Sequence, residues 1–158
     1  MPIAWRVVKK KHKSTAFDGE GARLYGGRWT SVGRRAVYTS SSVALATLEI
    51  LVHMGLVNKP VVVNSYVIYR VDVPESLVLE IDPKALPTNW AAPIAPAQLS
   101  VIGDAWLDAR EKPVLRVPSA VVLSESNFIL NPEHPRFSRL RIGPEQPYAF
   151  DSRLLDRR

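Results

Sequence analysis

The most apolar stretch of the chain, from Ser42 to Gly55, contains a single carboxylate, Glu49. Ser41 or Ser42 can cap the first turn of a helix and Gly55 can end it, so the segment is predicted to be a helix. Because apolar side chains surround it almost completely, we expect this helix to run through the core and not across the surface. Burying an ionised side chain without partners is expensive. Glu49 is therefore predicted to face a basic partner or a cleft that receives a cationic ligand.

His53 follows Glu49 by four residues, which places it one helical turn away on the same face. Its imidazole is a titratable group within reach of whatever surrounds the carboxylate.

Composition limits the class of protein. The chain has 158 residues and 46% hydrophobic content, enough for one domain over residues 1–158 that buries its core without metal or disulfides. It has no cysteine, which excludes thiol nucleophiles and thiolate metal sites and fits a reducing compartment. We find no signal peptide and no run near the roughly 18 apolar residues of a membrane span. We expect a soluble, cytoplasmic protein with no membrane contact.

The net charge of +6 and the pI near 9.8 indicate an anionic partner: a nucleic acid, a nucleotide or an acidic protein surface. The charge is concentrated in four runs, which are Lys9–Lys13, Arg34–Arg35, Arg136–Arg141 and Arg157–Arg158. Few aromatic residues lie among them, which weakens a nucleic-acid interpretation. Charge alone does not identify the partner.

The hydrophobic pattern predicts a mixed α+β domain with a sheet-rich core. β-Branched and alternating segments predict strands at 3–8, 36–39, 59–74, 77–81, 114–123, 127–130 and 137–142. A period near 3.6 predicts a second helix over 97–110, and 9–20 is predicted to be a polar loop. Prolines at 83, 87, 93 and 96 predict an irregular excursion before that helix. The irregular order of helices and strands argues against a doubly wound sheet.

Arg28 lies in the glycine-rich segment Gly26-Gly27-Arg28-Trp29. A guanidinium in such a loop can hold a phosphate through two parallel hydrogen bonds. It can equally pair with a core carboxylate, Glu49 included, and spacing alone does not separate these interpretations. The segment matches neither the dinucleotide fingerprint nor a phosphate-binding loop that ends in Gly-Lys-Ser/Thr.

Other candidates are weaker on the residues alone. Tyr38 ends a predicted strand just before the helix and can either reach the same cleft or pack as an ordinary ring. Ser119 lacks a Gly-x-Ser-x-Gly elbow, so a serine hydrolase is not supported. The three histidines, His12, His53 and His134, are far apart without metal-ligand spacing, so no metal site is expected, and His134 is predicted to brace a turn.

Six segments together closely resemble the RES domain, the toxin family of bacterial RES/Xre toxin–antitoxin pairs. They are Gly26–Trp29, Ala36–Ser40, Leu48-Glu49 with His53, Gly103–Leu107, Val117–Ala120 and Asn131–Pro135, and the match runs in order from about Trp5 to Asp151. The resemblance implies a fold similar to that of ADP-ribosyltransferase toxins. It also implies an activity on NAD+, which would be a substrate, with no metal cofactor.

Carried over from the family, the arginine corresponds to Arg28, the tyrosine to Tyr38, the glutamate to Glu49 and the serine to Ser119. The resemblance makes Glu49, Arg28 and Tyr38 the catalytic residues. It makes His53, Ser119 and Asn127 further residues of the NAD+ pocket.

Cleavage of the bond between nicotinamide and ribose builds positive charge on the sugar, so a fixed carboxylate is valuable. The hypothesis is that Glu49 stabilises this cation, Arg28 binds the pyrophosphate, Tyr38 contacts the nicotinamide riboside and Ser119 orients the ribose or carboxamide. Water, phosphate or a protein side chain could accept the ADP-ribose, giving a hydrolase, a phosphorylase or an ADP-ribosyltransferase.

Two other classes of function remain open at the level of sequence. One is a basic toxin that binds or cuts RNA, and the other is a structural partner in which Arg28 and Glu49 form a buried pair. The resemblance further implies a cognate Xre-like antitoxin that covers the cleft and a homodimer within the toxin–antitoxin complex. It implies contact with nucleic acid only through the antitoxin.

Overall fold

The computed structural model describes residues 1–56 and 62–155, and the strands within these ranges form one mixed sheet. The strands are β1 (Ile3–Lys9), β2 (Val37–Ser40), β3 (Tyr66–Asp72), β4 (Val78–Glu80), β5 (Val114–Pro118), β6 (Ser126–Leu130), β7 (Arg141–Ile142) and β8 (Gln146–Tyr148). Their order is β4-β5-β6-β2-β1-β3-β7, with β8 also paired to β3. Every described pairing is antiparallel except that of β4 with β5.

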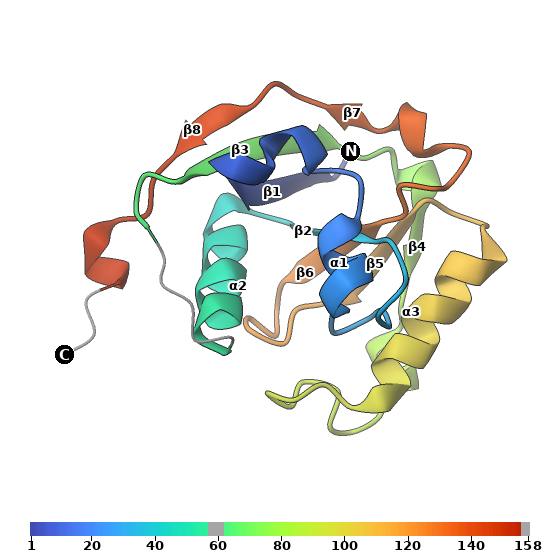
Figure 1. Cartoon of the computed structure of the whole chain (residues 1–158). Coiled ribbons are helices and arrows are strands. Elements are labelled where there is room, and N and C mark those ends of the chain that lie inside the picture. The colour runs from blue at the N-terminus through green and yellow to red at the C-terminus, as the bar shows by residue number, and fades with distance from the viewer. Residues whose placement is uncertain (57–61, 156–158) are drawn as a thin grey trace.

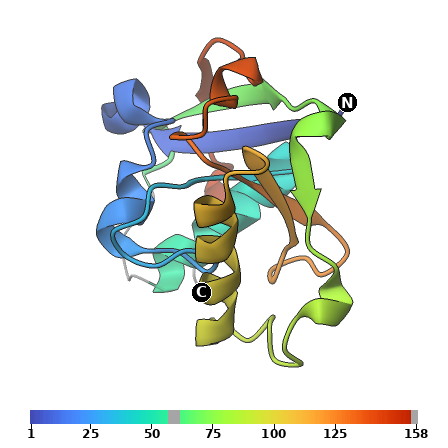
Figure 2. The ribbon, with the colours of Figure 1, turned by 90° about the vertical axis from the view of Figure 1, so that its right-hand side faces the viewer.

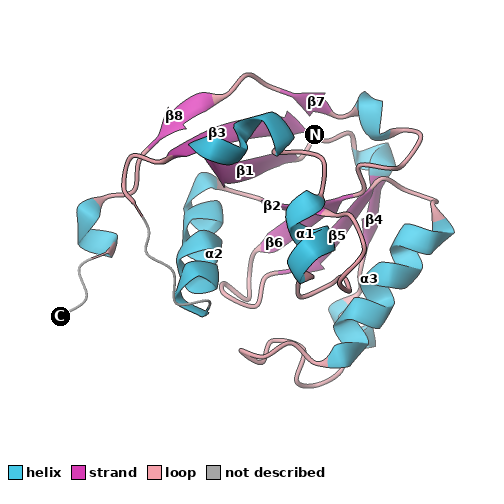
Figure 3. Ribbon diagram, in the orientation of Figure 1, coloured by secondary structure: helices cyan, strands magenta, loops and turns pink. Residues whose placement is uncertain are grey.

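The sheet has two parts that meet at β1 and β2 through one registered pair, Trp5 with Ser40. Figure 1 shows β1, β3, β7 and β8 in one part and β2, β6, β5 and β4 in the other. The helices are α1 (Glu20–Tyr25), α2 (Val43–Leu56) and α3 (Ala97–Ala109), and Figure 3 shows them beside the strands. Short 3₁₀ turns cover Lys10–Thr15, Glu75–Leu77, Pro83–Ala85, Phe137–Arg139 and Ser152–Leu154. No helix in the described ranges is long and apolar enough to cross a membrane.

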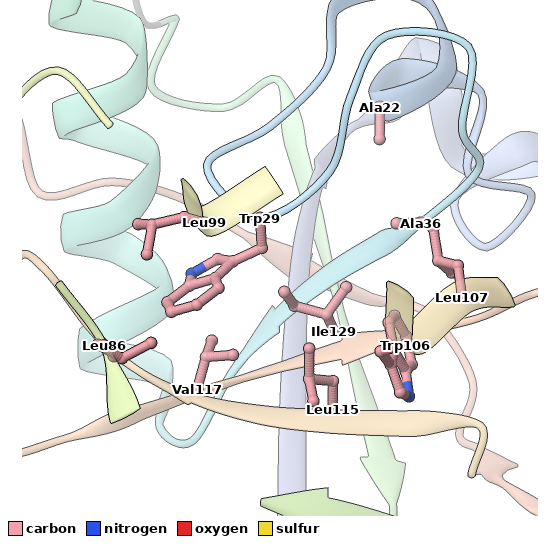
Figure 4. Packing of buried hydrophobic residues seen from close by; sticks show 10 residues of the cluster. All are labelled: Ala22, Trp29, Ala36, Leu86, Leu99, Trp106, Leu107, Leu115, Val117 and Ile129. Atoms are coloured by element: carbon pink, nitrogen blue, oxygen red, sulfur yellow. The ribbon is translucent and has the colours of Figure 1, made fainter. Parts of the chain in front are cut away.

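The helix α3 covers the part of the sheet formed by β5 and β6, as the view from its side shows (Figure 2). Its buried Leu99, Trp106 and Leu107 join a cluster with Leu115, Val117 and Ile129 of the strands. Figure 4 shows the indole of Trp29 among Leu86, Leu99 and Val117. The residue after Arg28 is thus anchored in the core.

Gly103 allows α3 to approach the loop that carries Arg28. A Cβ at this position would lie 1.6 Å from the main-chain oxygen of Trp29, far inside van der Waals contact. The absence of a side chain at Gly103 is therefore what lets helix and loop touch.

The predicted helix at 42–55 is confirmed as α2, and Ser42 is its cap, because the Ser42 Oγ accepts a hydrogen bond of 3.0 Å from the Leu45 amide. The expectation that this helix is enclosed is wrong. Leu48 and Val52 are 39% and 43% exposed, because the sheet covers only the side that carries Leu45 and Ala46.

Several other predictions of local structure need correction. The predicted loop at 9–20 holds a 3₁₀ helix and the start of α1. The strand predicted from 59 begins at Tyr66, and residues 59–61 lie outside the described ranges. The strand predicted over 114–123 ends at Pro118, where the chain turns, and the one predicted over 137–142 is a 3₁₀ turn followed by the short β7. The sequence pattern did not predict α1 or β8.

Candidate functional site

Glu49 lies on α2 and faces the end of the β5–β6 hairpin. Its Oε1 accepts two hydrogen bonds, one of 2.8 Å from the Oγ of Ser119 and one of 2.7 Å from the Nδ2 of Asn127. Ser119 directly follows β5, and Asn127 lies in β6 opposite Val117, so the hairpin register brings both donors to one place. No hydrogen bond from a described residue reaches Oε2, which leaves one carboxylate oxygen available.

The hydroxyl of Ser119 is fully used within the protein. Its oxygen accepts hydrogen bonds of 3.1 and 3.0 Å from the amides of Val121 and Val122, so its proton is directed to Glu49. Ser119 is 0% exposed, so it could affect a ligand only through its hydrogen bond to the carboxylate of Glu49. In this structure the proton of Ser119 is thus committed to Glu49, and the hypothesis that Ser119 orients the ribose or carboxamide stays a prediction.

Asn127 has a second polar atom that is buried. Its Oδ1 has no hydrogen-bond partner among the described residues, while its Nδ2 serves Glu49. The amide is therefore oriented by the carboxylate, with its acceptor end unsatisfied.

Arg28 is partly buried, and its guanidinium binds main-chain carbonyls. It donates from Nη1 to the oxygen of Trp90 at 3.0 Å, and from Nη2 to those of Ala92 and Pro93 at 2.9 and 3.3 Å. Among the described residues it forms no ion pair within 4.0 Å, so a close pair between Arg28 and Glu49 does not exist in this structure. Burial lowers the pKa of Arg28, and the negative charge of Glu49 partly opposes this. Arg28 and Glu49 thus share one electrostatic neighbourhood without touching.

The hydroxyl of Tyr38 holds the glycine-rich loop in place. Its hydroxyl accepts a hydrogen bond of 3.1 Å from the Trp29 amide and shares one of 2.8 Å with the Oγ1 of Thr30. A Cβ on Gly27 would lie 2.4 Å from this hydroxyl, so glycine is needed at that position. Burial raises the pKa of Tyr38 to about 12. The neutral phenol is the stable form at physiological pH.

The sixth predicted residue, His53, lies on α2 but is exposed, and it makes no hydrogen bond with a described residue. The structure brings Glu49, Ser119 and Asn127 into direct contact and places Arg28 near them. Tyr38 is connected to this group indirectly, because it supports the loop that carries Arg28.

Two further residues support the loop and were not singled out from the sequence. Asp104 of α3 accepts hydrogen bonds from the amide and the hydroxyl of Ser31, at 3.0 and 2.5 Å. Thr30, which is 1% exposed, meets Tyr38. Asp104 lies in Gly103–Leu107, one of the six segments that carry the resemblance, but its contact with the loop was not predicted.

Two surface cavities lie elsewhere. One of about 290 Å³ is lined by Arg34, Arg35, Leu107, Asp108, Arg110, Asn131 and Glu133, and one of about 350 Å³ by Lys9, Lys10, Lys11, Val62, Asn64, Ser65 and Tyr66. Neither includes Arg28, Tyr38 or Glu49. In the first, Arg34 pairs with Asp108 and Arg35 with Glu133, so most of its positive charge is neutralised locally.

Within residues 1–56 and 62–155, no three His, Asp or Glu side chains are grouped to hold a metal ion. His134 occupies a turn, as predicted, where its Nδ1 accepts from the Arg136 amide at 3.0 Å and its Nε2 lies 2.9 Å from the oxygen of Arg110.

The relatives found by comparison with known proteins agree with one another. The family model described as the RES domain matches residues 3–151. A protein of Photorhabdus laumondii named "Toxin Res" is 37% identical over 154 residues, covering 97% of this chain and 97% of the relative. A protein of Sphingobium named "Prs ADP-ribosylating toxin" is 31% identical over 156 residues, covering 96% of this chain and 95% of the relative.

A solved structure, the Mycobacterium tuberculosis MbcT–MbcA toxin–antitoxin complex, contains a chain with a similar fold. The TM-score is 0.76 at 18% identity, covering 94% of this chain and 84% of that one. At this identity the likeness concerns the fold, and it agrees with the mixed α+β domain predicted from the sequence.

Proposed function

The chain belongs to the RES domain family, and from this premise we propose that it is the toxin of a bacterial toxin–antitoxin pair that consumes NAD+. The bond broken is the one between nicotinamide and ribose, and nicotinamide leaves with the bonding electrons. Names of relatives at 37% and 31% identity, a Res toxin and an ADP-ribosylating toxin, support this class of activity.

The single observation that carries the proposal is the hydrogen bonding of the Glu49 carboxylate. Two donors fix its Oε1, and its Oε2 has no donor among the described residues. A carboxylate held in this way needs little reorganisation to stabilise positive charge that develops on the ribose. In this role Oε2 faces the sugar, while Ser119 and Asn127 hold the group in place.

Arg28 supplies the complementary charge. Its guanidinium can bind the pyrophosphate of NAD+ through two parallel hydrogen bonds once its donors are free. Tyr38 sets the position of the loop that carries Arg28, through its bonds to Trp29 and Thr30. Nicotinamide is a good leaving group, so the reaction needs no strong general acid.

The test is the concentration of NAD+ over time with purified protein and with the Glu49→Gln variant. We expect Glu49→Gln to fold and to lose activity by about 10²- to 10³-fold, as when one preorganised electrostatic group is removed. Glu111→Gln is the matched control, because Glu111 is exposed and its side chain makes no described contact. A Glu49→Gln variant that consumes NAD+ at the wild-type rate would refute the proposal.

A second candidate is transfer of the ADP-ribose to a protein, which the name of the Sphingobium relative favours. Hydrolysis, phosphorolysis and transfer share the same first half of the reaction and differ in the acceptor. Mass spectrometry of the products with water alone, with phosphate and with cell lysate separates them. ADP-ribose, ADP-ribose phosphate and a protein heavier by one ADP-ribose are the respective products.

We also propose a cognate antitoxin partner in the cytoplasm, where NAD+ is abundant. A protein with a similar fold was solved in a toxin–antitoxin complex. Co-expression with a candidate antitoxin, followed by size-exclusion chromatography, tests both the pairing and a homodimeric toxin within it. NAD+ loss that is unchanged by the partner would count against inhibition.

A further inference from the structure

We infer that segment 87–96 is a lid over the Glu49 site and that Arg28 is its latch, which a ligand carrying a diphosphate group releases by taking the guanidinium from the loop carbonyls. The inference rests on the proposed function for the identity of that ligand. It concerns a conformational step that accompanies binding of that ligand.

The segment has few attachments other than Arg28. It contains no helix or strand. Its described main-chain hydrogen bonds are two local turns, Trp90 to Pro87 and Ala92 to Asn89, and one bond at its end, from the Leu99 amide to Pro96. The three bonds from Arg28 are the hydrogen bonds that tie residues 87–95 to the rest of the described chain. Trp90 and Ala95 add apolar contact with the core cluster, whereas Ile94 is 87% exposed.

The ends of the segment are fixed, which suits a lid. Leu86 before it and Leu99 after it are 9% and 0% exposed and belong to the core cluster. Pro87, Pro93 and Pro96 restrict the backbone between them, so the segment has few conformations to explore. Figures 1 and 2 both place it at the lower end of the molecule, where the turn between β5 and β6 and the C-terminal end of α2 also lie. Ser119 and Asn127 flank that turn.

A diphosphate can compete with the loop carbonyls for the N–H groups of Arg28. Three of the five N–H groups of Arg28 are occupied by neutral carbonyl oxygens, with no carboxylate partner among the described residues. A diphosphate offers anionic acceptors to the same N–H groups, and these add an attraction between opposite charges that a neutral carbonyl oxygen does not provide. Each parallel pair of N–H groups on a guanidinium includes Nη2, which donates to Ala92 and Pro93 here. Two parallel bonds to a diphosphate therefore detach the segment.

The experiment measures amide hydrogen exchange of residues 88–95 by mass spectrometry. Arg28→Gln, without any ligand, is expected to speed exchange of the Trp90 and Ala92 amides, which donate to carbonyls within the segment, by at least about tenfold, because three bonds that hold the segment are lost. Arg139→Gln is the matched control, since Arg139 is exposed and its side chain makes no described contact. Exchange in Arg28→Gln no faster than in the control would overturn the latch.

A second arm uses the wild-type protein, so it does not depend on how a variant folds. ADP-ribose, which lacks the scissile bond, and inorganic pyrophosphate are the probes, with binding measured by calorimetry. Saturation is expected to speed exchange in residues 88–95 severalfold. A probe that binds without speeding exchange there would make Arg28 a fixed structural clamp and overturn the inference.

The two arms also separate this inference from the proposed function. If pyrophosphate releases the segment while NAD+ stays intact with the wild-type protein, the lid stands and the proposed activity fails. If NAD+ is consumed while bound ADP-ribose leaves exchange unchanged, the activity stands and the lid fails.

Discussion

Ser119 and Glu49 are 70 residues apart in sequence and are joined by a hydrogen bond of 2.8 Å, in which the buried hydroxyl donates to the carboxylate. The serine can donate in only this direction, because the amides of Val121 and Val122 occupy its oxygen. The turn after β5 therefore determines where the carboxylate on α2 points.

Replacing Ser119 with alanine tests this relationship. Ser119→Ala removes one of two donors to Glu49, so kcat for NAD+ consumption should fall about tenfold to a hundredfold with KM little changed. Stability should also fall by about 1 to 3 kcal/mol, since two amides lose their acceptor. Steady-state kinetics below the unfolding temperature and urea unfolding measure the two effects. Ser124→Ala, at an exposed position of the same turn, should change neither. A Ser119→Ala enzyme with raised KM and unchanged kcat would place the hydroxyl on the substrate instead.

Gly27 provides a test of the loop. The Cβ of Gly27→Ala would lie 2.4 Å from the Tyr38 hydroxyl, so the ring must move and the loop with Arg28 must shift. We expect a loss of about 1 to 3 kcal/mol of stability and at least about tenfold in kcat/KM. Gly21→Ala is the control, because a Cβ there meets no atom within 4 Å and the residue lies in α1. Near-equal behaviour of the two variants in thermal unfolding and in NAD+ consumption would contradict the role of Gly27.

Gly103 tests the contact between α3 and the loop. In Gly103→Ala the new methyl group would lie 1.6 Å from the main-chain oxygen of Trp29, which no side-chain rotation can relieve. We expect a loss of about 3 kcal/mol or more, and a lower melting temperature by circular dichroism. A melting temperature within about 2 °C of wild type would show that helix and loop separate easily.

Tyr38 gives a pH-dependent prediction. Burial raises its pKa to about 12 in the native protein, whereas the pKa of an unfolded tyrosine is about 10. Between these values the native state keeps a proton that the unfolded state releases, so the stability from Tyr38 is complete below about pH 10 and declines up to about pH 12. The decline is on the order of 2 to 3 kcal/mol.

Urea unfolding at pH 8 to 12 measures this decline. The wild-type protein should lose more stability across the alkaline range than Tyr38→Phe, which has no group to ionise at that position. Tyr25→Phe, at a residue that is 78% exposed, should keep the wild-type dependence. Parallel curves for wild type and Tyr38→Phe would show that the hydroxyl ionises as freely when folded as when unfolded.

The sequence by itself determined local structure. The caps of α2 and the period near 3.6 in α3 predicted these helices, and the residues of β1 and β6 predicted strands, because short-range steric and hydrogen-bonding preferences set them. The resemblance added candidate site residues by matching motifs, and the family match over 3–151 confirms the family, while the roles of those residues stay predictions. Where local preference is weak, as for α1, the two-residue β7 and the proline-containing β8, packing decided the structure and the pattern predicted it poorly.

Only the tertiary structure decided how the candidate residues are used. The sequence left open whether Arg28 pairs with Glu49, and the fold instead gives Arg28 the carbonyls of Trp90, Ala92 and Pro93. It turns Ser119 toward Glu49 and leaves His53 exposed. These partners are separated by tens of residues, and a hydrogen bond depends on distances of a few tenths of an ångström, which are set when the hairpin, α2 and the loop pack together.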